Sequence, residues 1–534
     1  MLGATSVTSP GNVIDQNTLS ISGTESSVRQ ISYFAGLNLE WKDRYILDGL
    51  IRRDGSSLFG SQNRWANFGR ASVAWRVTQE PWFKVPGVSE FKFRGSYGTA
   101  GGRPSFSAQY ETFSVSSTNI SQGTLGNKNL KPENISEVEV GFDAEFFNRI
   151  GVQFTYAQSD AENQILLVPA PAITGFQDQW RNAGTLENET YELAVNVPIL
   201  TGRDLSWSMR GTFDRNRTTI TKLDPPPFDF GPNTQGATTL FRAVKGRPYA
   251  EIYGRRFLDN CMQLPTAGVP GSVSATTNFQ SECLAGRMFS KNDEGYLTYT
   301  GNSVASPTDL GQGITANRWN TGLTAAWAPW GAPLTFGHPI VLRDNSGGGI
   351  VAPIGSALPD YRWALSTNLQ YKKFAAYVLL DATMGRGIYN NGRGWAMLDF
   401  LAVDGDQVGK TLQSAKPQSY YYRAGPPDNA NGMGGFYDIL GANTRVTENA
   451  NFAKVREVSL SYRLGRVQGL FGEWNISMIG RNLYTFTNYR GFDPEVGFAA
   501  GSGGNNAGSA AINAVDAFTF PNLRTLTFSI GTTF

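Results

Sequence analysis

The stretch SEVEVGFDAEFFNRIGVQFTYA, residues 136–157, decides the fold class. Its even positions from Val138 to Phe146 are apolar, and most of the positions between them carry glutamate or aspartate. An alternation with a period of two residues is typical of a β-strand with one apolar and one polar face. The same alternation resumes from Ile150 to Tyr156, after the two residues Asn148 and Arg149. The stretch is therefore predicted to be a β-hairpin.

The same pattern extends over most of the chain and predicts about fourteen to sixteen strands, most near the roughly 9 to 11 residues that cross a bilayer as tilted β-structure. Clear further examples run from Leu205 to Phe213 and from Tyr361 to Tyr371. Within the least readable stretch, 258–360, extra strands are expected at 296–300 and 317–327. Short connections alternate with long ones rich in Gly, Asn, Pro and Ser. The short ones are 42–43, 148–149, 201–203 and 372–373, and the long ones are 55–64, 162–187, 218–248 and 386–451.

Three all-β architectures compete for such a pattern. A soluble sandwich also alternates apolar and polar residues, but stacked sandwiches need linkers, and none is evident. A propeller would show a repeat of about 40 to 50 residues, and we find none. Alternating short turns and long loops are typical of outer-membrane barrels. Because every backbone group must be paired in hydrocarbon, such a sheet has to close, with its apolar face toward lipid and its polar face inward. We predict a transmembrane antiparallel β-barrel with long extracellular loops and short periplasmic turns.

Composition excludes several classes of function. The 534 residues include 46 Lys+Arg, 44 Asp+Glu and one histidine, which gives a formal net charge of +2. That balance offers no basic footprint for nucleic acid. With only His338 available, triads and zinc sites are nearly ruled out, and no catalytic motif is present. No apolar run approaches the ~18 residues of a transmembrane helix. We therefore expect no enzyme, no cofactor and no metal site, and we expect outer-membrane lipid as a partner.

The end of the chain carries a second signal. Leu526, Phe528, Ile530 and Phe534 alternate with small or polar residues and end the sequence on an aromatic. This pattern looks like the barrel-insertion signal that bacterial outer-membrane proteins present, although a routine final strand would look similar. Several aromatics near strand ends predict membrane-interface girdles, with ordinary packing as the alternative. They are Tyr361, Tyr371, Phe374, Trp474, Tyr484, Phe486 and Tyr489.

Two smaller features bear on chemistry. Cys261 and Cys283 are the two cysteines, 22 positions apart, and they are read either as a disulfide in an oxidising compartment or as two free thiols. The acidic row Glu137, Glu139, Asp143 and Glu145 projects to one side of its strand and could bind a cationic solute or Ca²⁺. A hydrated lumen tolerates such a row without any ligand, so no ligand is assigned.

Several segments resemble the SusC/RagA-type, TonB-linked outer-membrane transporters. They are IRRDGSSLFGSQNRWANFGRASVAWRVTQEPWF (51–83), FKFRGSYGTAGGR (91–103), LGNKNLKPENISEVEVGFDAEFFN (125–148), FAKVREVSLSYRLG (452–465), RNLYTFTNYRGFDPEV (481–496) and FPNLRTLTFSIGTTF (520–534). The resemblance implies import of glycans or peptides through a plugged barrel in the outer membrane. It also implies a surface-exposed SusD-like lipoprotein and TonB as partners.

The resemblance also frames the domain prediction. Residues 1–27 are expected to be an irregular segment or a partial strand, and residues 28–534 a partial barrel with a long loop region at 258–360. No plug domain or TonB box is found before residue 28, and the barrel of this family has about 22 strands. The chain thus resembles the C-terminal barrel portion of such a transporter. A passive or structural barrel, serving as a porin or an adhesin, is the alternative. Substrate-contact residues stay unassigned.

Overall fold

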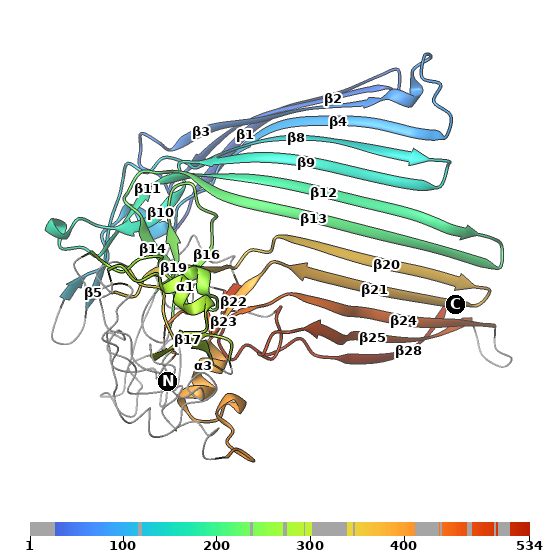
Figure 1. Cartoon of the computed structure of the whole chain (residues 1–534). Coiled ribbons are helices and arrows are strands. Elements are labelled where there is room, and N and C mark those ends of the chain that lie inside the picture. The colour runs from blue at the N-terminus through green and yellow to red at the C-terminus, as the bar shows by residue number, and fades with distance from the viewer. Residues whose placement is uncertain are drawn as a thin grey trace, which may run out of the picture.

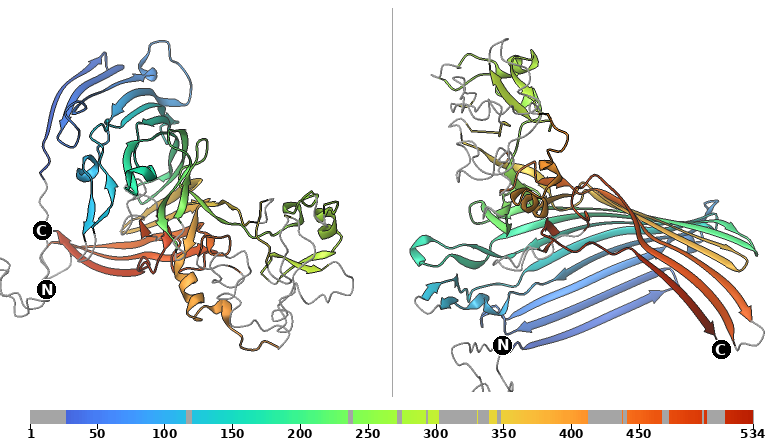
Figure 2. Two further views of the ribbon diagram at one scale, coloured as in Figure 1. Left: turned by 90° about the vertical axis from the view of Figure 1, so that its left-hand side faces the viewer. Right: turned by 90° about the horizontal axis from the view of Figure 1, so that it is seen from below.

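The computed structural model describes residues 27–115, 120–234, 239–270, 275–292, 294–301, 330, 339–344, 348–411, 437, 441–466, 472–495, 498–499 and 513–533. Thirteen strands form one continuous antiparallel sheet. In order across the sheet they are β1 (Gln30–Trp41), β2 (Tyr45–Ser56), β3 (Trp65–Arg76), β4 (Val88–Ala100), β8 (Asn134–Phe146), β9 (Ile150–Glu162), β12 (Gly184–Thr201), β13 (Leu205–Leu223), β20 (Tyr361–Tyr371), β21 (Phe374–Met384), β24 (Phe452–Arg466), β25 (Glu473–Thr487) and β28 (Thr525–Thr533). The sheet curves into an open trough, as Figures 1 and 2 show.

The main sheet has thirteen strands among the described residues, whereas the sequence predicts about fourteen to sixteen. One of the extra strands expected within 258–360 is β18 (Leu297–Gly301), which pairs with β17 (Met288–Lys291) outside the main sheet. The other, at 317–327, falls outside the described residues, as does the predicted N-terminal segment up to residue 26. The trough has two edges, β1 and β28, and neither has a second neighbour among the described strands.

Short turns all lie at one end of the strands, which we call the turn rim. The hairpins β1–β2, β8–β9, β12–β13 and β20–β21 close there, within one residue of the positions that the sequence predicts. Lys42, Asp43, Asn148 and Lys372 adopt left-handed backbone with φ between 51° and 54°. Asn and Asp reach this conformation more easily than other residues because their short side chains form local hydrogen bonds, which the lysine side chain does not. The length and geometry of such tight turns fix the register of the hairpins.

Long loops gather at the opposite end, the loop rim, and fold into small sheets of their own (Figure 1). These sheets comprise β5 (Phe113–Val115) with β6 (Ile120–Gln122); β10 (Ile165–Pro169), β11 (Asp178–Asn182) and β7 (Thr124–Leu125); β14 (Phe228–Asn233), β15 (Thr239–Ala243), β16 (Glu251–Arg255) and β19 (Val351–Ser356); and β23 (Thr447–Asn449), β22 (Gly387–Asn390), β27 (Asn513–Asp516) and β26 (Phe498–Ala499). Among the described residues, the α-helices α1 (Phe279–Leu284) and α3 (Asn391–Leu398) belong to the same layer. Within the described ranges, every helix is too short or too polar to cross a membrane.

The best-buried residues lie in this loop layer. The largest cluster joins Phe241, Ile252, Tyr389, Val446 and Val515, which come from loops far apart in the sequence. Each of these side chains is at most 4% exposed. Apolar residues of the main strands are, by contrast, largely half-exposed or exposed. The wall therefore has no protein core of its own, and its apolar face needs another apolar environment.

Candidate functional site

The register places apolar side chains in continuous rows on one face of the wall. One such row runs Leu369, Ala376, Leu460, Met478 and Phe528 across five neighbouring strands. Leu460 is 53% exposed and Phe528 is 74% exposed. Side chains this apolar and this exposed mark the surface that contacts lipid.

The predicted insertion residues can be placed on the same surface. Leu526, Phe528 and Ile530 of β28 are all exposed, and each pairs with a residue of β25. Phe534 lies outside the described residues. Their role in insertion stays a prediction.

Aromatic rings cluster near both rims. At the turn rim, the Trp41 and Tyr45 rings lie 5.5 Å apart and the Phe374 and Tyr462 rings 4.5 Å apart. At the loop rim, the Phe213–Tyr361 and Tyr484–Phe486 ring pairs lie 5.8 Å and 4.6 Å apart. Aromatic rings at two levels, with Trp or Tyr in each pair, match the girdles expected at the two membrane interfaces.

One residue of the predicted girdle was misassigned. Tyr489 is 6% exposed, and its hydroxyl donates a hydrogen bond of 2.7 Å to Asp516. Burial, together with the adjacent Asp516 carboxylate, raises the pKa of Tyr489 above its ordinary value. Tyr489 therefore belongs to the core of the loop layer, because the chain has already left the wall at Thr487.

The opposite face of the wall carries paired charges. Arg94 of β4 contacts Glu139 at 2.6 Å and Asp143 at 3.3 Å, and Lys92 contacts Asp143 at 2.6 Å. Further pairs are Arg70–Asp48, Arg362–Asp214 and Arg481–Glu457, at 2.8 to 2.9 Å. This inner face is a hydrated, charged surface of the kind that lines a wide barrel.

Two carboxylates of the acidic row predicted on β8 thus form ion pairs within the protein. Glu139 and Asp143 face the basic residues of β4, which the register brings alongside through the pairs Ser96–Glu139 and Lys92–Asp143. Among the described residues, no group of three or more His, Cys, Asp or Glu side chains is placed to hold a metal ion.

A charged cluster ties the loop rim to the inner face of the wall. Arg456 is the extra residue of a β-bulge in β24, since Val455 pairs with Leu380 while Glu457 pairs with Leu379. The bulge lets its guanidinium reach Asp381 on the neighbouring strand, at 2.7 and 2.9 Å, and Glu495 of the loop between β25 and β28. Bulges commonly re-aim a side chain in this way.

A buried lysine completes this cluster, which we call the rim latch: Asp381, Lys454, Arg456, Asp493 and Glu495. Lys454 is 1% exposed, and its ammonium contacts Asp493 at 2.7 Å and Glu495 at 2.8 Å. Burial raises the pKa of Glu495, but the hydrogen bonds from Arg456 and Lys454 outweigh it and lower that pKa to about 2. Glu495 therefore stays ionised at neutral pH, and its contacts hold the loop against the wall.

A second charged network lies beside α3. Arg393 contacts Asp404 at 2.6 Å and Glu448 at 2.9 Å, and Arg445 contacts the same Asp404 at 2.9 Å. Burial raises the pKa of Asp404, but the hydrogen bond and charge of Arg393 lower it overall. Arg393 and Asp404 also line a cavity of about 620 Å³ whose rim includes the exposed rings of Phe492 and Phe518. Such a mixture of charge and exposed apolar surface is typical of a contact site.

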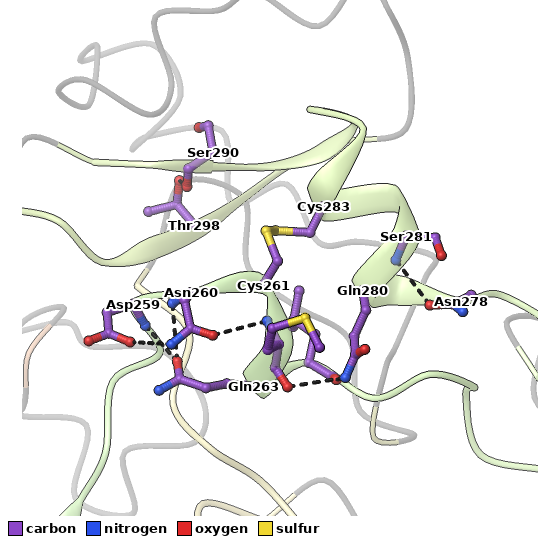
Figure 3. Close-up of a disulfide and its surroundings, with 12 residues drawn as sticks. Asp259, Asn260, Cys261, Gln263, Asn278, Gln280, Ser281, Cys283, Ser290 and Thr298 are labelled. Carbon is purple, nitrogen blue, oxygen red and sulfur yellow. Dashed lines mark hydrogen bonds between the residues drawn. A yellow bond between two sulfur atoms is a disulfide. The ribbon is translucent and has the colours of Figure 1, made fainter.

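The loop region at 258–360 contains a small module around the two cysteines (Figure 3). Cys261 and Cys283 are joined by a disulfide, with Cα atoms 5.6 Å apart. Asn260 caps the 3-10 turn Cys261–Gln263, and Asn278 caps α1 by accepting a hydrogen bond from the Ser281 backbone. Phe279, Phe289, Leu258 and Leu297 form the module's core. The bridge thus fastens two capped segments over a minimal core.

The rim latch and the α3 network are the features that sequence reasoning missed. Apart from Arg393 and Asp404, which are 11 positions apart, their ion pairs join residues 39 to 75 positions apart, and no local pattern records such pairs. A signal was nevertheless present, because Lys454, Arg456, Asp493 and Glu495 all fall within the two segments, 452–465 and 481–496, that carry the family resemblance.

Comparison with known proteins identifies the class of this fold. The family model "TonB dependent receptor-like, beta-barrel" matches residues 3–404. The chain belongs to this family, and it is an outer-membrane protein.

The chain is also similar to particular members of this class. TonB-dependent receptor P3 of Formosa agariphila is 25% identical over 527 residues, which cover 94% of this chain and 45% of the relative. TonB-dependent receptor SusC of Bacteroides thetaiotaomicron is 29% identical over 211 residues, covering 36% of this chain and 21% of SusC. Among solved structures, that of the RagAB peptide transporter aligns with a TM-score of 0.64 at 20% identity, over 97% of this chain and 49% of that one. The chain spans about half the length of the relatives that match it along most of its sequence.

Proposed function

We propose that this chain forms the larger part of the barrel of a SusC/RagA-type importer, which takes up glycans or peptides through the outer membrane with energy from TonB. The carrying observation is the wall itself, with an apolar outer face, a charged inner face and all long loops at one rim. Membership in the TonB-dependent-receptor-like family supports the proposal. A barrel wider than eight strands cannot be filled by its own side chains, so it encloses water or a plug.

The edge strands of the trough, β1 and β28, each lack a second neighbour among the described strands, so the complete assembly has to supply one. Backbone groups of β1 and β28 must be paired within hydrocarbon. Because the relatives are about twice as long as this chain, we assign the pairing partners to further strands of the complete protein. A SusD-like surface lipoprotein is proposed as the partner over the loop rim. The α3 cavity, with exposed Phe492 and Phe518, offers apolar surface there.

Uptake measurements test this function. Cells lacking the gene would be complemented with the complete reading frame and offered labelled oligosaccharides and labelled peptides, with and without TonB. We expect uptake of one of the two cargo classes that ends when TonB is deleted. Uptake that continues without TonB would instead support a passive pore.

A further inference from the structure

A polar cavity of about 220 Å³ opens on the inner face of the wall near the loop rim, beside the β1 edge. Arg52 and Asp54 of β2 line it, and both lie on the same side of their strand as Asp48, which pairs with Arg70 on the inner face. The register continues this lining across the neighbouring strands through the pairs Ser32–Asp54 and Arg52–Phe68. The cavity therefore faces the lumen and not the lipid.

Positive charge dominates this cavity. Its lining holds three guanidinium groups, those of Arg52, Arg64 and Arg103, against the single carboxylate of Asp54. Arg52 contacts Asp54 at 3.0 Å, and Arg103 donates a hydrogen bond to the side-chain oxygen of Gln30. Within the described part of the chain, neither Arg64 nor Arg103 forms an ion pair with a carboxylate. Two cations are thus left for a ligand that brings negative charge.

The carboxylate of Asp54 points to a second requirement. Its Oδ2 atom accepts the contact from Arg52, while its Oδ1 atom is buried and finds no hydrogen-bond partner among the described residues. A buried acceptor without a donor is unfavourable by about 1–3 kcal/mol, and a bound molecule with a hydroxyl or amide group would remove that cost. The cavity therefore suits an oxyanion that lies next to a hydrogen-bond donor.

Two glycines beside the cavity, Gly101 and Gly102, leave no room for a side chain. A Cβ atom at Gly101 would approach the Phe68 ring to 2.2 Å, and one at Gly102 would approach the Glu133 carboxylate to 1.7 Å. The bare backbone at Gly101 leaves Phe68 free to lie below Arg52, whose guanidinium carbon is 5.7 Å from the ring centre. Glu133 is the other acid nearby, and it accepts the Ile165 N–H at 2.8 Å. Burial raises the pKa of Glu133, which weakens its competition for the arginines.

We propose that this arginine cavity, formed by Arg52, Asp54, Arg64, Phe68 and Arg103, binds an oxyanion, either a carboxylate or a sulfate, on a solute that also carries a hydroxyl or amide donor. Arg52 lies in the RRDGSS segment, Arg64 in the SQNRW segment that follows it, and Arg103 in the GGR segment. That the solute is cargo on its way through the barrel rests on the proposed function. The binding itself does not.

Calorimetric titration of the complete protein in detergent tests the proposal, with sodium sulfate and sodium acetate as separate probes at constant ionic strength. We expect saturable binding of at least one probe, and which probe binds distinguishes sulfate-bearing from carboxylate-bearing solutes. Arg64→Gln should weaken it about tenfold or more, because a charge-assisted hydrogen bond is lost. Gly101→Leu should weaken it as well by filling the cavity.

Arg53→Gln is the matched control, since Arg53 is next to Arg52 in the sequence but lies on the outer face, 5.4 Å from the Trp65 ring. It should leave binding unchanged. Absence of saturable binding to both probes would overturn the inference, and so would equal weakening by Arg53→Gln and Arg64→Gln. Sulfate or acetate binding that persists in a protein without TonB-dependent uptake would contradict the proposed function alone.

Discussion

Replacing Leu460 by arginine should destabilise the membrane-inserted protein by ~2–4 kcal/mol, the cost of a cation facing lipid near the bilayer midplane. Leu460 is the ninth of the fifteen residues of β24, six positions before Arg466 at the turn rim. With a rise of ~3.3 Å per residue and a tilt of ~40°, it lies about 15 Å from that end along the membrane normal. That depth is near the middle of an apolar band about 25 Å tall.

The neighbours of Leu460 offer the new charge no partner. Leu460 pairs with Ala376 on one side and Met478 on the other, and both are apolar. The matched control is Ser461→Arg, one position further along the same strand, where the side chain projects to the charged inner face between Ala375 and Ser477. There we expect a change within about 0.5 kcal/mol, as for an ordinary exposed site.

Reversible urea unfolding of the complete protein in phospholipid vesicles, followed by tryptophan fluorescence, measures both variants. Equal denaturant slopes would show that the two variants unfold from the same state. If Ser461→Arg cost as much as Leu460→Arg, or if Leu460→Arg were neutral, the assignment of the two faces would be refuted.

Two further predictions concern the loop layer. Because the pKa of Glu495 is lowered from 4.5 to about 2, its stabilising contribution is present above its unfolded value and lost as pH falls from about 4.5 to 2, by as much as ~3 kcal/mol. Unfolding free energy measured from pH 6 to 2 should therefore fall less in Glu495→Gln, and an equal fall in both proteins would contradict the latch. Replacing Cys261 and Cys283 by serine should destabilise the module by about 3 kcal/mol, since the bridge closes a loop of 22 residues. Limited proteolysis should then cut within 258–301 faster than in the parent, whereas unchanged cleavage would argue against a stabilising bridge.

The wall was largely predictable from sequence because its physics is local. The alternation in 136–157 yields β8 and β9 where the structure has them, and the turn between them is one residue longer than the predicted connection 148–149. Each residue's face follows from a period of two, so the lipid-facing and inner sets could be written down without coordinates.

The loop layer could not be predicted in the same way, since its contacts join distant segments. Tyr389 of β22 pairs in parallel with Val515 of β27, more than a hundred positions away. Tyr489 was assigned to the girdle because it follows closely on Tyr484 and Phe486. The strand ends at Thr487, however, and Tyr489 lies in the core of the loop layer. The bulge at Arg456 is also invisible to a strict period of two, which it interrupts by one residue.

The placement of the apolar cores has a consequence for how such proteins diversify. The disulfide module keeps a buried cluster of its own around Phe279 and Phe289, while strand pairing in the wall depends on register and on the surrounding bilayer. Changes within this module thus leave the hydrogen-bond ladder of the wall intact. A single transmembrane wall can in this way carry loop modules of different structure. Selection for new ligands can then change the loop rim without changing the strands.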